Sequence, residues 1–170
     1  MADWRRGIPD GPLSAFGAAI VLSVVAVDQV TKLIAEAALE FGTVIDILPV
    51  LALYRVHNTG IAFSFLAGGG IPLIALTLAI TVGVIVFWMR SHEGGKLASA
   101  GFALILGGAL GNLVDRLRLG YVIDFLLLHA GERTLFVFNL ADAALTLGPA
   151  LLIALYVWPP AGEAKNAPSD

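Results

Sequence analysis

The sequence contains no cysteine and few charged residues, and both absences exclude classes of function. Without cysteine there is no disulfide framework, no thiolate nucleophile and no thiolate metal site. Only 14% of the 170 residues are charged, and the net charge is −3. No basic stripe interleaved with aromatic residues is present, so a nucleic-acid partner is not expected.

Several catalytic motifs are missing as well. The three histidines, His57, His92 and His129, are far apart and form no H-E-x-x-H motif, so we expect no metal and no organic cofactor. There is no G-x-S-x-G, and no serine lies near a histidine with a supporting acid, which disfavours a serine hydrolase. Carboxylates therefore remain as the candidate catalytic groups.

Apolar residues dominate what is present. They make up 58% of the chain, and the mean hydropathy is +0.89, so the composition indicates a membrane protein. Four apolar runs are long enough to cross a bilayer, and they lie at about residues 13–35, 71–89, 97–116 and 140–158. We expect one four-helix domain over residues 1–158, followed by a short tail at 159–170.

Positive charge near the spans predicts their orientation. Arg5 and Arg6 precede the first span, and Arg90 and Lys96 flank the turn between the second and third, which places both regions in the cytoplasm by the positive-inside rule. An even number of spans then makes both termini cytoplasmic. The outer side also carries lysine and arginine, so the count alone is not decisive. The first apolar run, following two arginines, also leaves open a cleaved signal peptide.

The two outer segments differ from ordinary loops. Residues 44–58, "VIDILPVLALYRVHN", are rich in β-branched and aromatic residues, and residues 121–139 give two apolar runs around a Gly131–Glu132 turn. We therefore expect an all-α membrane protein with four transmembrane helices, a small β-like extracytoplasmic segment and a second, hairpin-like outer loop. In the third span, Gly107 and Gly111 form a G-x-x-x-G that allows close helix packing.

Polar residues of three spans converge at the outer helix ends. Their spacing puts each pair on one helical face, and the pairs are Asp28 with Lys32, Asn112 with Asp115, and Asn139 with Asp142. Each pair also has a structural explanation. The first could be a helix ion pair and the third an N-cap with a first-turn acid, while Asp115 could pair with Arg116, Arg118 or Lys32. Their common depth nevertheless favours a site.

Two carboxylates of the outer region suggest its chemistry. Asp142 lies near the start of a membrane-length apolar run, and Asp124 lies in an apolar outer segment that the hairpin-like loop can bring back towards it. Two acids that meet in a low-dielectric site tend to share one proton. One can then act as a base towards water and the other as an acid towards a scissile carbonyl, as in aspartic proteases.

Four blocks of sequence, in order, resemble the bacterial lipoprotein signal peptidases (signal peptidase II). They are "DQVTK" at 28–32, "NTGIAFS" at 58–64, "GNLVDR" at 111–116 with "GYVIDF" at 120–125, and "FNLAD" at 138–142. The resemblance implies that Asp124 and Asp142 are the catalytic pair. It also implies a set of residues that support the site or bind substrate, namely Asp28, Lys32, Asn58, Gly60, Asn112, Asp115, Arg116 and Asn139.

The resemblance further implies a substrate and a location. An aspartic endopeptidase of the bacterial inner membrane, acting near the outer leaflet, would cleave diacylglyceryl-modified prolipoproteins just before the lipidated cysteine. We expect no cofactor and a monomer surrounded by membrane lipid, and the resemblance implies that cyclic peptide antibiotics are inhibitors. Substrate acyl chains could lie between the helices, and the segment 58–66, with Phe63 and Phe65, could clamp the peptide.

Two other functions remain open. A small ion or proton transporter would use intramembrane acids as a relay, but a relay should extend through the membrane, and the second span carries no acid. A non-catalytic assembly subunit would use the same residues as buried ion pairs. In that protein, replacing Asp124 or Asp142 with asparagine should unfold the chain.

Overall fold

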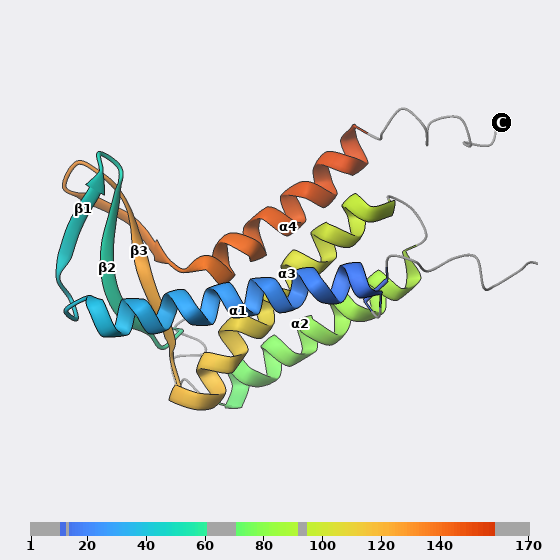
Figure 1. Cartoon of the computed structure of the whole chain (residues 1–170), viewed down its shortest axis with the longest axis horizontal. Coiled ribbons are helices and arrows are strands. Elements are labelled where there is room, and N and C mark those ends of the chain that lie inside the picture. Colours follow the sequence, from blue (N-terminus) through green and yellow to red (C-terminus); the bar gives the residue numbers. More distant parts are fainter. Residues whose placement is uncertain (1–10, 13, 61–70, 92–94, 159–170) are drawn as a thin grey trace, which may run out of the picture.

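The computed structural model describes residues 11–12, 14–60, 71–91 and 95–158. The described part of the chain contains four helices and four strands, with the helices side by side and the strands at one end of them (Figure 1). In chain order they are α1 (Ala15–Ala38), β1 (Val44–Leu48), β2 (Leu51–Asn58), α2 (Ile71–Arg90), α3 (Gly95–Leu119), β3 (Val122–Ala130), β4 (Arg133–Phe138) and α4 (Leu140–Val157).

The four predicted spans are confirmed, because all four helices are long and apolar enough to cross a membrane. Two of them run further than hydropathy predicted. α1 continues to Ala38, where Arg55 Nη1 donates to the carbonyl oxygen of Glu36 at 2.7 Å and so caps the last turn. α3 continues to Leu119, and it stops at Gly120, whose φ of +81° suits a residue without a side chain.

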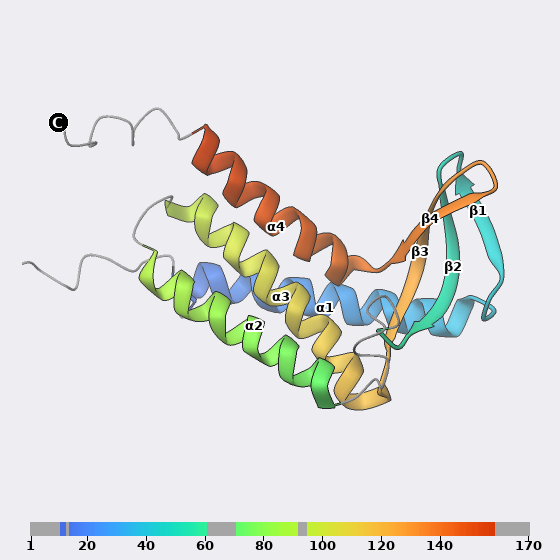
Figure 2. The same ribbon diagram turned by 180° about the vertical axis from the view of Figure 1, so that it is seen from behind.

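α3 is the central helix, since it packs against each of the other three (Figure 2). Small residues make this possible. A Cβ atom at Gly107 would lie 2.7 Å from Val24 Cβ of α1, and one at Gly111 would lie 3.2 Å from Ala141 Cβ of α4. The G-x-x-x-G of this helix therefore does bring the helices close together.

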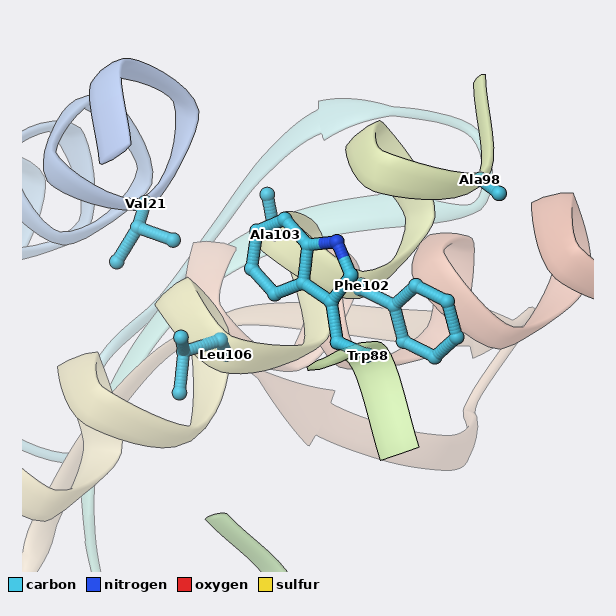
Figure 3. Packing of buried hydrophobic residues seen from close by; sticks show 6 residues of the cluster. All are labelled: Val21, Trp88, Ala98, Phe102, Ala103 and Leu106. Carbon is cyan, nitrogen blue, oxygen red and sulfur yellow. The ribbon is translucent and has the colours of Figure 1, made fainter. Parts of the chain in front are cut away.

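A hydrophobic core, whose side chains are drawn in Figure 3, fixes the end of the bundle that lies away from the sheet in Figure 1. There the rings of Trp88 and Phe102 stack with centroids 5.9 Å apart, and the Trp88 indole donates to Ser99 Oγ at 3.4 Å. The remaining members of the cluster are Val21, Ala98, Ala103 and Leu106. This core holds α1, α2 and α3 together where no candidate site residue lies.

The outer segments form strands, as predicted, but they join in one antiparallel sheet of order β1-β2-β3-β4. β2 from the first outer segment pairs with β3 from the second, and this register places Val56 opposite Asp124. β3 and β4 are joined by the predicted Gly131–Glu132 turn. The sheet positions the site, because β3 carries Asp124 and β4 leads into the first turn of α4.

Candidate active site

A cluster of polar side chains lies where α1, α3, the start of α4 and the strands β2 and β3 meet. Most of these side chains are buried, with Asp28, Lys32, Asp115, Asp124 and Asn139 each at most 2% exposed. Buried polar groups are costly unless their partners are supplied. The partners in this cluster are therefore specific, and the hydrogen bonds define the site.

Two asparagine amides connect the two candidate catalytic acids. Asn139 Nδ2 donates to Asp124 Oδ1 at 2.7 Å and to Asn112 Oδ1 at 3.1 Å. Asn112 Nδ2 in turn donates to Asp142 Oδ1, also at 2.7 Å. The structure thus brings together, through one continuous network, acids from the middle of the sheet and from the start of α4.

The second oxygen of each acid also accepts a hydrogen bond. Asn58 Nδ2 donates to Asp124 Oδ2 at 2.9 Å, and the backbone N–H of Asn139 donates to Asp142 Oδ2 at 3.2 Å. Asp142 N donates back to Asn139 Oδ1 at 2.9 Å, which completes a capping box. Asn139 therefore both caps the N-terminus of α4 and donates a hydrogen bond to Asp124.

Burial makes the Asp124 carboxyl a weaker acid than an aspartate in solvent. The pKa of this carboxyl is raised to about 6, chiefly by loss of solvent and also by the neighbouring charge of Asp142. The bonds from Asn58 and Asn139, and the charge of Lys32, act in the opposite direction. The carboxyl consequently exchanges a proton close to neutral pH, where a general acid or base is most effective.

Lys32 is 1% exposed, and all three of its ammonium protons have acceptors. Its Nζ lies 2.8 Å from Asp28 Oδ2, 2.9 Å from Asp115 Oδ2 and 3.0 Å from Asn112 Oδ1. Because an ammonium has three donors, this environment satisfies it completely. Of the three cations considered for Asp115, the ion pair is therefore with Lys32.

Sequence reasoning missed Gln29 as a member of the site. Its Nε2 donates to Asp115 Oδ1 at 2.9 Å, to the carbonyl oxygen of Gly111 at 3.2 Å and to Asp28 Oδ2 at 3.3 Å. Its Oε1 accepts from Arg118 at 3.2 Å. The signal was its place inside "DQVTK", where an amide next to a buried acid at a helix end can reach the facing helix.

Gly60 and Arg116 lie at the margin of the network. Gly60, at φ +84°, donates its backbone N–H to Asn58 Oδ1 at 2.9 Å and so orients that amide towards Asp124. Arg116 is half-buried, close enough to Asp124 and Asp142 to feel their charge, and its Nε has no hydrogen-bond partner. The expected clamp at 58–66 lies, beyond Gly60, outside the described residues.

Within the described ranges, no group of three or more histidine, aspartate or glutamate side chains is arranged to hold a metal ion. The chemistry that this arrangement offers is proton transfer between two carboxyls held by neutral amides. Such a pair can activate water without a nucleophilic side chain.

The chain is similar to known membrane enzymes over most of its length. A family model described as signal peptidase (SPase) II matches residues 20–158. Lipoprotein signal peptidases of Brucella ovis and Brucella melitensis are 47% identical over 137 residues, covering 79% of this chain and 84% of theirs. Two solved structures of bacterial membrane enzymes align with TM-scores of 0.74 and 0.72 at 26% and 27% identity. They cover 90% and 85% of this chain, and 94% of each solved chain.

Proposed function

The chain belongs to the signal peptidase II family, and from that premise we propose that it is an aspartic endopeptidase whose catalytic pair is Asp124 and Asp142. Family membership makes it a protease and a multi-pass bacterial membrane protein. One observation carries the aspartic assignment: Asp124 and Asp142, from separate elements, are linked through two asparagine amides, and each of their four carboxylate oxygens accepts a hydrogen bond.

The reaction needs one proton shared between the two acids. The ionised carboxylate takes a proton from water as the water oxygen attacks the scissile carbonyl carbon. The protonated carboxyl gives its proton to the carbonyl oxygen, which forms a tetrahedral diol. When the diol collapses, the C–N bond breaks and the carboxyl that took the water proton gives it to the amine nitrogen. The other carboxylate takes a hydroxyl proton of the diol, so the signal peptide leaves with a new carboxyl terminus and the pair again holds one proton.

The substrate that fits this site is the signal peptide of a prolipoprotein whose cysteine carries diacylglycerol. Its lipid chains would hold the scissile bond at the membrane interface, and the acids lie at the end of the helices where the sheet begins (Figure 1). Cleavage would fall just before the lipidated cysteine. Arg116, whose Nε has no partner, would bind a substrate carbonyl beside the acids.

The protein would act as a monomer in the bacterial inner membrane, without a cofactor, with both termini in the cytoplasm and the site near the outer leaflet. Cyclic peptide antibiotics would inhibit it by occupying the catalytic pair.

The decisive experiment offers purified protein in detergent two peptides that differ only in a diacylglyceryl group on the cysteine, with products identified by mass spectrometry. We expect cleavage of the lipidated peptide alone. Asp124→Asn and Asp142→Asn should each lower the rate by at least about 10²–10⁴-fold, the usual contribution of general acid–base catalysis. Asp46→Asn is the matched control, since Asp46 is 72% exposed on β1 of the same sheet.

Two results would reject the proposal. Full activity of either dyad variant would show that the acids are not catalytic. Absence of cleavage by the parent protein, with dyad variants that unfold at lower temperature, would favour an assembly subunit held by buried polar groups. Thermal unfolding should therefore be measured on the same samples.

A further inference from the structure

Two buried acids outside the dyad each bind the backbone N–H that directly precedes a dyad aspartate. Asp28 Oδ1 accepts from the N–H of Ala141 at 2.9 Å, and the next residue is Asp142. Asp115 Oδ2 accepts from the N–H of Ile123 at 3.1 Å, and the next residue is Asp124. Asp28 thus fixes the backbone at the start of α4, and Asp115 fixes the backbone at the start of β3.

Lys32 joins these two acids. Its ammonium lies 2.8 Å from Asp28 and 2.9 Å from Asp115, and its third proton goes to Asn112, which in turn holds Asp142. Gln29 Nε2 also donates to both acids, so the two dyad backbones are joined through the Lys32 ion pairs and, beside them, through one neutral amide. We propose that Asp28, Lys32 and Asp115 form a clamp that sets the separation of the two catalytic carboxyls, an inference that rests on the proposed function.

The composition of this clamp is hard to explain by stability alone. Two acids and one lysine, all at most 1% exposed, place three ionisable side chains in the interior. Buried ion pairs are often no more stabilising than apolar residues of the same volume, because desolvation offsets the attraction. A role in position accounts for their charge and direction, since rigid support of the reacting groups is worth much more in catalysis than in folding.

The backbone of α3 is shaped to admit the clamp. Gly111 faces Asp28 so closely that a Cβ there would lie 2.7 Å from Asp28 Oδ2. A side chain at this position would push the carboxylate away from Lys32 and Ala141. The glycine of "GNLVDR" therefore serves the clamp as well as the packing of the helices.

Asp115 binds its two clamp partners through one carboxylate oxygen, whereas Asp28 binds its partners through both. Asparagine substitutions at the two positions should therefore have different effects. Asp115 uses one oxygen, Oδ2, for both Lys32 and the Ile123 N–H, and its Oδ1 accepts only from Gln29. An asparagine at 115 keeps the oxygen that binds Lys32 and the Ile123 N–H. Its new N–H group gives up only the contact with Gln29, which keeps its bonds to Gly111 and Arg118. Asp115→Asn should therefore preserve the clamp where Asp115→Ala destroys it.

Asp28 needs both of its oxygens. Oδ1 holds the Ala141 N–H, whereas Oδ2 holds Lys32. An asparagine at 28 supplies one acceptor for these two partners and turns an N–H group towards the other. Asp28→Asn should therefore be nearly as damaging as Asp28→Ala, although it removes the same charge as Asp115→Asn.

The test measures kcat, KM, the temperature of unfolding and inhibitor affinity for the four variants, with lipidated peptide as substrate. The inhibitor is the same lipidated peptide with a statine unit at the scissile bond, which mimics the tetrahedral diol. A displacement of about 1 Å can cost 10²-fold, so we expect kcat about 100-fold lower in Asp28→Ala, Asp28→Asn and Asp115→Ala, with KM within about threefold. Affinity for the statine peptide should fall with kcat, since it reports transition-state geometry.

Phe102→Ala is the matched stability control, because Phe102 lies in the core at the opposite end of the bundle (Figure 3). It should lower the unfolding temperature and leave kcat within about threefold. If the alanine variants do not fold, the values of kcat for Asp115→Asn and Asp28→Asn still test the clamp. Equal kcat for those two, or losses that follow unfolding temperature as in Phe102→Ala, would overturn the clamp. Active Asp124→Asn or Asp142→Asn would instead overturn the proposed function.

Discussion

Three asparagine side chains donate hydrogen bonds to the two acids, and the orientation of each amide is fixed by a hydrogen bond to its oxygen. The oxygen of Asn58 accepts from Gly60 N, that of Asn112 accepts from Lys32, and that of Asn139 accepts from Asp142 N. Each NH₂ group must therefore face a carboxylate. Neutral amides suit this role because they stabilise charge without titrating themselves.

The donor from Asn58 can be removed to test the acidity of Asp124. That hydrogen bond stabilises the charged carboxylate, so Asn58→Ala should raise the pKa of Asp124 above its value of about 6. In the pH profile of kcat/KM, the limb that belongs to Asp124 should move to higher pH, whichever of the two catalytic roles this acid has. Arg133→Ala, at the exposed start of β4, is the control and should leave the profile in place. An unshifted limb in Asn58→Ala would mean that Asp124 does not control it.

At the scale of elements, α3 determines how closely the acids can approach. It carries Asn112 and Asp115 on the part of its surface that faces α1 and α4, and small residues let both helices come near. Ala141 of α4 lies 3.2 Å from where a Gly111 Cβ would be. Helix packing and site geometry therefore depend on the same turn of α3.

Gly111→Ala tests this dependence. The added Cβ would meet Asp28 Oδ2 at 2.7 Å and Ala141 Cβ at 3.2 Å, so we expect about 1–3 kcal/mol of destabilisation and a loss of activity larger than the stability change explains. Gly83→Ala on α2 is the control, because nothing lies within 4 Å of its Cβ position. The measurements are the free energy of unfolding and the rate of peptide cleavage, made on both variants and on the parent protein. Parent activity in Gly111→Ala would contradict the close approach.

The elements were largely predictable, because hydropathy over a membrane length is a strong signal and the spans needed only shifts of a few residues at their ends. The pairing of β2 with β3 was not, since strand register depends on contacts between distant segments. The same limit applies to the site. Helical spacing predicted the Asp28–Lys32 and Asn139–Asp142 pairs, but backbone donors such as the Ala141 N–H leave no trace in a side-chain pattern.

At the scale of the whole molecule, the two ends of the bundle differ in kind. One end is closed by the aromatic core around Trp88 and Phe102, and the other carries the sheet and the buried polar network (Figures 1 and 3). The end of α2, the start of α3 and the last turn of α4 lie at the first end (Figure 2). The buried polar network therefore lies at one end of the helices, and the orientation of the chain in the membrane would decide from which side a substrate reaches it.

Single cysteines can establish that orientation, because the chain has none of its own. Glu132→Cys lies at the exposed turn between β3 and β4, and Lys96→Cys lies at the exposed start of α3. With Arg5, Arg6 and Arg90 in the cytoplasm, a membrane-impermeant maleimide added to spheroplasts should label position 132 at once and position 96 only after permeabilisation. The reverse pattern would place the acids on the cytoplasmic side, away from the outer leaflet where the proposed substrate is cleaved.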